Sequence, residues 1–168
     1  GSFLNVVIHR LPKMMERAGA WLEKCRLGKK AVFHYGTRME QLTSDSQPEG
    51  SAMRSPLIEL ALTKAGFEKT AGRVRESIDL FFKHLEEVRG TSKVWESHFD
   101  ASVVHDAYHY YFGCWYAART IRLLPANDQR GLAAKLVEQV LPTQEIDGGF
   151  VDGQMQGKSV GTALALMT

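Results

Sequence analysis

One amphipathic stripe constrains the fold of this chain more than any other sequence feature. Apolar side chains recur between Val74 and Val88 at intervals of three and four residues, and Gly90 follows them. This spacing places them on one side of a helix, because an α-helix has 3.6 residues per turn. A helix with one apolar side must bury that side against other elements. The stripe consists of Val74, Ile78, Phe81, Phe82, Leu85 and Val88.

Five further segments have the same helical period, so we expect an all-α fold of about six helices. One begins at Pro12 and ends before Gly28. Another begins at Ser55-Pro56, read as a cap followed by a first-turn proline, and stops at Gly66. The remaining three run from about Val103 to Leu124, from about Asn127 to Pro142, and from about Ser159 onward. In the second helix, one face holds Leu57, Leu60, Ala61 and Lys64.

The segments between the helices carry turn-forming residues. Thr43–Ser51 is rich in such residues and is predicted to be a loop. Phe3–Ile8 and Ala31–Tyr35 are at most short extended pieces, and no window alternates as a sheet requires. Cys25 and Cys114 lie on apolar helix faces and are predicted to be buried and unpaired.

An aromatic residue recurs in a glycine-containing loop after three of these helices. The aromatic residues are Phe33, Trp95 and Phe150. Each unit therefore reads as a helix, a loop with an aromatic residue, and a second helix. Because one helical hairpin cannot bury both of its faces, we expect neighbouring hairpins to stack.

The last of these loops allows the most detailed prediction. Gly148-Gly149 is expected to supply a positive φ, and Asp147 to bond the backbone of its own turn. Phe150 is expected to fold back between helices. Gln144 is expected to cap the last carbonyls of a neighbouring helix. All of these roles are structural.

The loop reads Gln144-x-x-Asp147-Gly148-Gly149-Phe150, and Val160-Gly-Thr-Ala follows it. This pattern resembles the repeat of terpenoid cyclases and protein prenyltransferase β-subunits, which have a glutamine, then Asp-Gly-Ser-Trp, then a Tyr-Gly-Thr-Ala helix. The overall likeness is to uncharacterised bacterial proteins with squalene-cyclase-like toroids. The resemblance covers about residues 12–168. It implies that residues 1–168 form one α/α-toroid-like domain, as a fragment of a longer chain. Phe150 and Val160 depart from the family pattern.

A second resemblance lies at Asp106-x-Tyr108-His109, which is similar to a helix of the prenyltransferases. In that family the residue matching His109 is a zinc ligand, and His105 lies one turn before it. The partner motif Asp-x-Cys is absent, as are the Asp-x-Asp-Asp and Asp-Cys-Thr-Ala acid motifs of the cyclases. We therefore expect neither a metal nor a cofactor, and we favour a binding domain over an enzyme.

The densest group of aromatic residues lies on the predicted helix from Val103 to Leu124. Aromatic faces bind apolar and cationic groups, although core packing explains the same residues. Our leading hypothesis is an α/α-toroid domain that binds an apolar small molecule, a peptide or a protein segment on a concave surface. The alternatives are a fragment of a cyclase-type or prenyltransferase-type enzyme, and a self-assembly domain that forms a homo-oligomer. The candidate pocket comprises His105, Asp106, Tyr108, His109, Tyr111, Phe112 and Trp115.

Charge and hydropathy exclude two classes of partner. The 21 basic and 19 acidic residues give a net charge of +2 and are intermixed. A nucleic-acid surface normally needs a clustered basic excess. No apolar run reaches the ~20 residues of a spanning helix, so no transmembrane span is expected. The cysteine content favours a cytoplasmic location.

The first residues of the chain form a separate case. Residues 1–17 resemble the first membrane-exit segment of prepilin peptidases. The cysteine pairs and the Gly-x-Gly-Asp motif of that family are absent, so its activity is not carried over. Residues 1–11 are therefore set apart as a candidate non-native or extended N-terminal segment.

Overall fold

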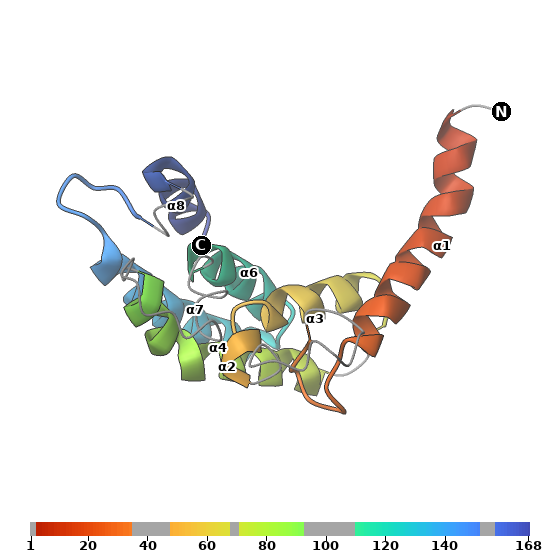
Figure 1. The fold of residues 1–168 in the computed structure, drawn as a ribbon, viewed down its shortest axis with the longest axis horizontal. Coiled ribbons are helices and arrows are strands. Elements are labelled where there is room, and N and C mark those ends of the chain that lie inside the picture. The colour runs from red at the N-terminus through yellow and green to blue at the C-terminus, as the bar shows by residue number, and fades with distance from the viewer. Residues whose placement is uncertain (1–2, 35–47, 68–70, 93–109, 152–156) are drawn as a thin grey trace.

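A computed structural model of the chain describes residues 3–34, 48–67, 71–92, 110–151 and 157–168. These residues form helices and the loops between them, with no strand in the described ranges (Figure 1). Arg26 and Phe33 form an isolated antiparallel bridge. The all-α prediction is confirmed. The helices are α1 (Phe3–Lys24), α2 (Pro48–Ser51), α3 (Ser55–Lys64), α4 (Ala71–Ser92), α6 (Tyr110–Ile121), α7 (Ala126–Val140), the 3₁₀ helix η3 (Leu141–Thr143) and α8 (Gly157–Leu166).

The helices pack in two adjacent rows. Helix α6 lies between α3 and α8 in one row, and it also packs on α4 and α7. Helices α4 and α7 are joined by an ion pair between Arg75 and Asp128 and by the Lys135 ammonium over the Phe82 ring. Helix α1 contacts α3 and projects away from the rows (Figure 1).

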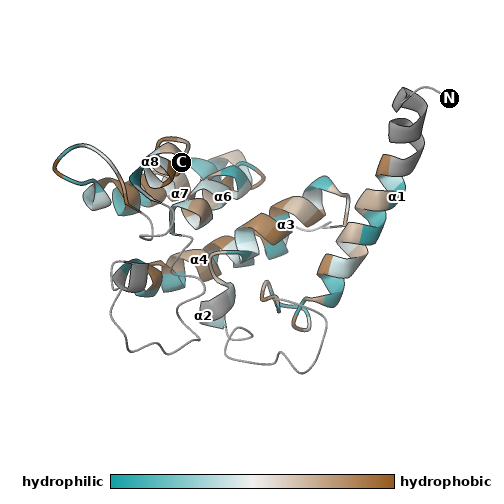
Figure 2. Ribbon diagram, turned by 45° about the horizontal axis from the view of Figure 1, so that its top comes forward, coloured by the Kyte–Doolittle hydropathy of each residue, from teal (hydrophilic) through white to brown (hydrophobic). Residues whose placement is uncertain are grey.

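The core lies between the two rows. The predicted stripe of α4 supplies five fully buried residues, and Phe82 is partly buried against them. Hydrophobic residues follow α3 and α4 along their length (Figure 2). Helix α7 contributes Leu136 and Val140. Cys25 and Cys114 are buried and free, as predicted.

Several predicted helix boundaries are wrong, for local reasons. Helix α1 begins at Phe3, and Pro12 lies inside it, because proline has a helical φ and here removes only one backbone donor. Pro48–Ser51, predicted to be part of a loop, forms the short helix α2. Helix α4 continues past Gly90 to Ser92. Ser55 does not cap α3. Its hydroxyl donates instead to the Ser51 carbonyl at 2.7 Å.

The buried side of α3 also differs from the predicted face. Ser55, Glu59 and Leu62 are fully buried, whereas the face with Leu57 and Lys64 is partly or fully exposed. Gly66 ends this helix with a φ of 80°, as its position predicts. The buried side of α3 therefore includes the carboxylate of Glu59, which the spacing of apolar residues did not indicate.

Candidate functional site

The connection between α7 and α8 has most of the local structure that its sequence predicts. Gly148 has a φ of 85°, in the left-handed region that favours glycine. The Gly149 N–H donates to the Asp147 carboxylate at 3.1 Å. Gln144 differs from the prediction, since its amide nitrogen donates at 2.9 Å to the Gly148 carbonyl of the same loop. It therefore closes its own turn and does not cap a neighbouring helix.

Phe150 anchors this loop to the core and to the next helix. The residue is buried, and its ring packs edge-on against Tyr111 with 5.7 Å between centroids. Its backbone N–H donates to the Thr162 hydroxyl of α8 at 2.9 Å. The preceding carbonyl, of Gly149, accepts from the Glu145 N–H at 2.8 Å. Phe150 therefore contacts both α6 and α8.

The connection after α1 has the same arrangement around Phe33. This ring is fully buried, and the Phe33 N–H donates at 2.9 Å to the Ser51 hydroxyl of α2. The preceding carbonyl, of Val32, accepts from the Leu27 N–H at 2.8 Å. The loops around Phe33 and Phe150 thus share these contacts, while Trp95 lies outside the described residues.

The side chain that closes each turn occupies the same place in both loops. Arg26 donates to the Lys30 carbonyl at 3.1 Å, four residues on, just as Gln144 donates to the Gly148 carbonyl. The two loops differ in what surrounds this side chain. Gln144 is exposed to solvent, whereas Arg26 is buried.

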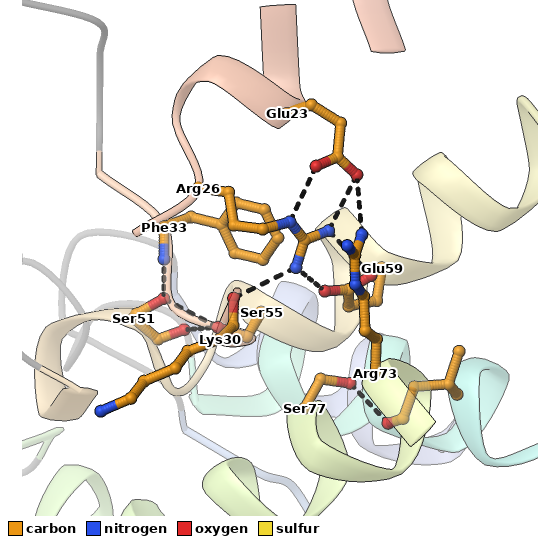
Figure 3. Close-up of polar contacts among 10 residues, drawn as sticks. Glu23, Arg26, Lys30, Phe33, Ser51, Ser55, Glu59, Arg73 and Ser77 are labelled. Atoms are coloured by element: carbon orange, nitrogen blue, oxygen red, sulfur yellow. Dashed lines mark hydrogen bonds and ion pairs between the residues drawn. The ribbon is translucent and has the colours of Figure 1, made fainter. Parts of the chain in front are cut away.

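Arg26 is the centre of an ion-pair network that joins α1, α3 and α4 (Figure 3). Its guanidinium donates to Glu59, which is fully buried, and to both carboxylate oxygens of Glu23 at 2.9 and 3.0 Å. Arg73 of α4 reaches Glu23 at 3.3 Å. The Phe33 ring lies 4.5 Å from the guanidinium carbon. The network fixes the first loop to two helices, so its evident role is structural.

In this network, Arg26 and Glu23 each stabilise the charged form of the other. Burial by itself lowers the pKa of Arg26, but its hydrogen bonds to Glu23 and Glu59 outweigh burial and raise that pKa. The hydrogen bond from Arg26 lowers the pKa of Glu23, and the Arg73 charge adds to this effect. Both shifts favour the charged forms of Arg26 and Glu23, as an ion pair in the protein interior requires.

Helix α6 places its residues on two opposite sides. On the inner side, the Tyr110 hydroxyl donates to the Gln139 carbonyl of α7 at 3.2 Å. Burial raises the pKa of Tyr110 above its ordinary value. The Tyr111 hydroxyl bonds Thr143 at 2.8 Å. A side chain at Gly113 would meet Met53, so the helix packs closely there. These residues belong to the core and cannot line an open pocket.

The opposite side of α6 carries what we call the aromatic face, which consists of Phe112, Trp115 and Tyr116. All three are partly exposed. The Trp115 and Tyr116 rings lie 4.6 Å apart, and Phe112 packs edge-on against Tyr116 at 4.7 Å. The Arg119 guanidinium carbon lies 5.5 Å from the Trp115 centroid. Tyr110 points to α7. By the period of the helix, the aromatic face therefore points away from the row of α4 and α7.

The structure divides the predicted pocket. Phe112 and Trp115 share the aromatic face, whereas Tyr111 lies in the core. The other four candidates, His105, Asp106, Tyr108 and His109, lie outside the described residues. Within the described ranges, no three side chains of His, Cys, Asp or Glu are grouped as a metal site requires.

A hollow beside the second loop does not involve the predicted pocket. It is open to solvent, and an ion pair between Lys158 and Asp147 lies at its edge. Its walls are mostly polar or small side chains, and none of the aromatic face reaches it. The lining residues are Asp147, Gly149, Lys158, Ser159, Thr162, Ala163 and Leu166.

Sequence reasoning missed the buried ion pair of Arg26 and Glu59, and it left Tyr116 out of the candidate pocket. Alignment of the two loops on their aromatic residues places Leu27 opposite Gln144, so Arg26 matches Gln144 only when the extra residue of the first loop is allowed for. Glu59 shares its helix side with Leu62, and this position was the available signal that the carboxylate is buried. Tyr116 is one turn from Phe112, so the helical period places both on one side.

Comparisons of the chain with protein-family models, with curated proteins and with solved structures found no match. The resemblance to toroid-forming families therefore stays a prediction from sequence motifs. Among the described helices, none combines the length and the hydropathy needed to cross a membrane.

Proposed function

We propose that this chain is a helical-repeat binding domain whose aromatic face receives an apolar ligand. The observation that carries the proposal is the cluster of Phe112, Trp115 and Tyr116 on the outer side of α6, a helix whose other sides are packed. Three partly exposed rings on one helix side offer a contiguous apolar surface, and such surfaces often mark binding sites.

Two further observations support this proposal. Helix α6 is held by contacts to four other helices, so its outer side chains project from a rigid support. Helices α3, α6 and α8 form one row, and the loop around Phe150 bonds to α8 of that row. In the toroid that the sequence motifs imply, one of the two rows of helices lines the concave surface. We assign that position to the row of α3, α6 and α8. The aromatic face would then point into the concavity.

The test uses a neutral apolar probe, N-phenyl-1-naphthylamine, whose fluorescence rises when it leaves water. We expect a saturable rise with the wild-type chain. Trp115→Ala is expected to weaken the probe's affinity roughly tenfold, which corresponds to the loss of about 1.4 kcal/mol of apolar contact. Trp21→Ala is the matched control, because Trp21 is also exposed but lies on α1.

Two results would contradict the proposal. One is a wild-type chain that gives no saturable signal. The other is a signal that Trp21→Ala removes and Trp115→Ala leaves unchanged. Circular dichroism of each variant checks that the helices are retained, which is expected because both tryptophans are at least partly exposed.

A further inference from the structure

Helix α1 presents an apolar stripe that the rest of the described structure does not cover. Leu11, Met14, Met15 and Trp21 are 48%, 63%, 40% and 48% exposed. Their spacing places them on one side of the helix over about 15 Å. Figure 2 shows hydrophobic and hydrophilic residues side by side along this helix, which projects from the two rows (Figure 1). Because these four apolar side chains lie together on one side of the helix, they form a patch and are not scattered surface residues.

The body of the protein holds α1 by a different side. Gly19 is buried under the Phe67 ring, so closely that a side chain at Gly19 would overlap the ring. One turn later, Glu23 joins the ion-pair network with Arg26 and Arg73. By the helical period, Gly19 and Glu23 lie at one edge of the apolar stripe. The stripe itself stays open while α1 is fixed in place.

The other edge of the stripe is basic. Lys13, Arg17 and Lys24 fall on one flank of the helix, next to Trp21 and Met14. All three are exposed, and no acidic side chain of the described part of the chain pairs with them. An apolar stripe with an aromatic residue and a basic flank is the pattern of a helix that lies in the plane of a membrane surface.

We propose that α1 binds the surface of an anionic lipid bilayer, with the stripe inserted among the lipids and the basic flank on the head groups. Charge favours this occupant over a second copy of the chain. An antiparallel pair of α1 helices would bring basic flank against basic flank. A parallel pair would need the flank with Glu23, which the body already covers. Anionic head groups complement the open basic flank.

The experiment is flotation of the wild-type chain with vesicles of pure phosphatidylcholine and with vesicles that also contain one quarter phosphatidylglycerol. We expect binding to the anionic vesicles and little binding to the neutral ones. Replacement of Lys13, Arg17 and Lys24 by glutamine is expected to weaken binding to anionic vesicles roughly 100-fold, about fivefold for each charge. Met14→Glu with Trp21→Glu is expected to abolish binding.

The controls separate this proposal from the aromatic face and from self-association. Leu141→Glu introduces one negative charge at an exposed apolar residue outside α1, and Trp115→Ala alters the aromatic face. Both variants should float like the wild type. The proposal is overturned if the wild type does not float or if the α1 variants still do. It is also overturned if sedimentation shows a dimer that Met14→Glu dissociates and vesicle binding is absent.

Discussion

The loops around Phe33 and Phe150 are two versions of one connection. Each has a buried aromatic ring, a backbone N–H bonded to a hydroxyl of the following helix, and a side chain that closes the turn four residues on. The surroundings of that last side chain differ, because Arg26 is buried with Glu59 while Gln144 faces solvent.

The comparison separates the parts of the loop that backbone geometry determines from the parts that its surroundings determine. The backbone bonds and the ring are the same in both loops, although the first loop is one residue longer between the turn-closing residue and the aromatic residue. The side chain that closes the turn, Arg26 or Gln144, differs with the residues that pack against the loop. In the first loop, α3 supplies a buried carboxylate, and a cation is then required. In the second loop the side chain at this place, Gln144, is exposed, and a neutral amide suffices.

The largest expected effect comes from making the first loop like the second. Arg26→Gln removes the guanidinium that donates to the buried Glu59 carboxylate, which is expected to cost about 3–5 kcal/mol in the free energy of unfolding. The matched change, Gln144→Ala, removes one exposed hydrogen bond and is expected to cost about 1 kcal/mol or less. Urea unfolding of both variants measures the difference.

A double substitution sharpens the test of that ion pair. Replacement of both partners, as Arg26→Met with Glu59→Leu, removes both charges and is expected to recover a large part of the loss. If Arg26→Gln costs no more than Gln144→Ala, the burial of Arg26 contributes nothing to stability, and the two loops are energetically equivalent.

A smaller effect is expected from the hydroxyl that accepts each aromatic N–H. Ser51 is fully buried and also bonds Ser55 at 2.7 Å, so Ser51→Ala leaves a buried N–H unsatisfied. We expect a loss of about 1–3 kcal/mol. Thr162 is partly exposed, and water can replace its hydroxyl in Thr162→Val, so the loss there is expected to be about 1 kcal/mol or less.

Hydrogen exchange locates this effect in the loops themselves. The amide of Phe33 should exchange faster in Ser51→Ala, and the amide of Phe150 should exchange faster in Thr162→Val, while each variant leaves the other loop unchanged. Equal acceleration of both amides in either variant would mean that the variants weaken the whole fold rather than one connection.

The parts of the fold that the sequence predicted are those set by local physics. The α4 stripe, the left-handed Gly148, the Asp147 turn and the buried Phe150 each depend on residues close in the chain. The repeated loop could be predicted for the same reason, since its aromatic residue and glycine lie within one short segment.

The parts that sequence reasoning missed depend on distant contacts. The buried Glu59 carboxylate accepts from Arg26, which lies 33 positions away in the chain. Helix α6 begins with Tyr110, Tyr111 and Phe112 in succession, so composition could not decide which rings face the core. Contacts with Gln139 and Thr143 settle this by holding the two tyrosine hydroxyls inside.

The smallest expected effect is in the acid range, where the two loops again differ. The pKa of Glu23 is lowered by its hydrogen bond from Arg26, so this group contributes stability above its ordinary pKa of 4.5 and loses it as the pH falls through the lowered value. The pKa of Asp147 is lowered by Lys158 from an ordinary 3.8, so the same sign applies at lower pH. Asp147 is fully exposed, and salt and water screen its ion pair.

The measurement is the urea midpoint at pH 7 and at pH 3.5 for the wild type, Glu23→Gln and Asp147→Asn. We expect the wild type to lose stability on acidification and Glu23→Gln to lose less, because its titrating group is gone. Asp147→Asn should follow the wild type closely. If Asp147→Asn reduces the acid sensitivity more than Glu23→Gln does, the exposed loop carries the stronger electrostatic contact, and burial is not what distinguishes the two connections.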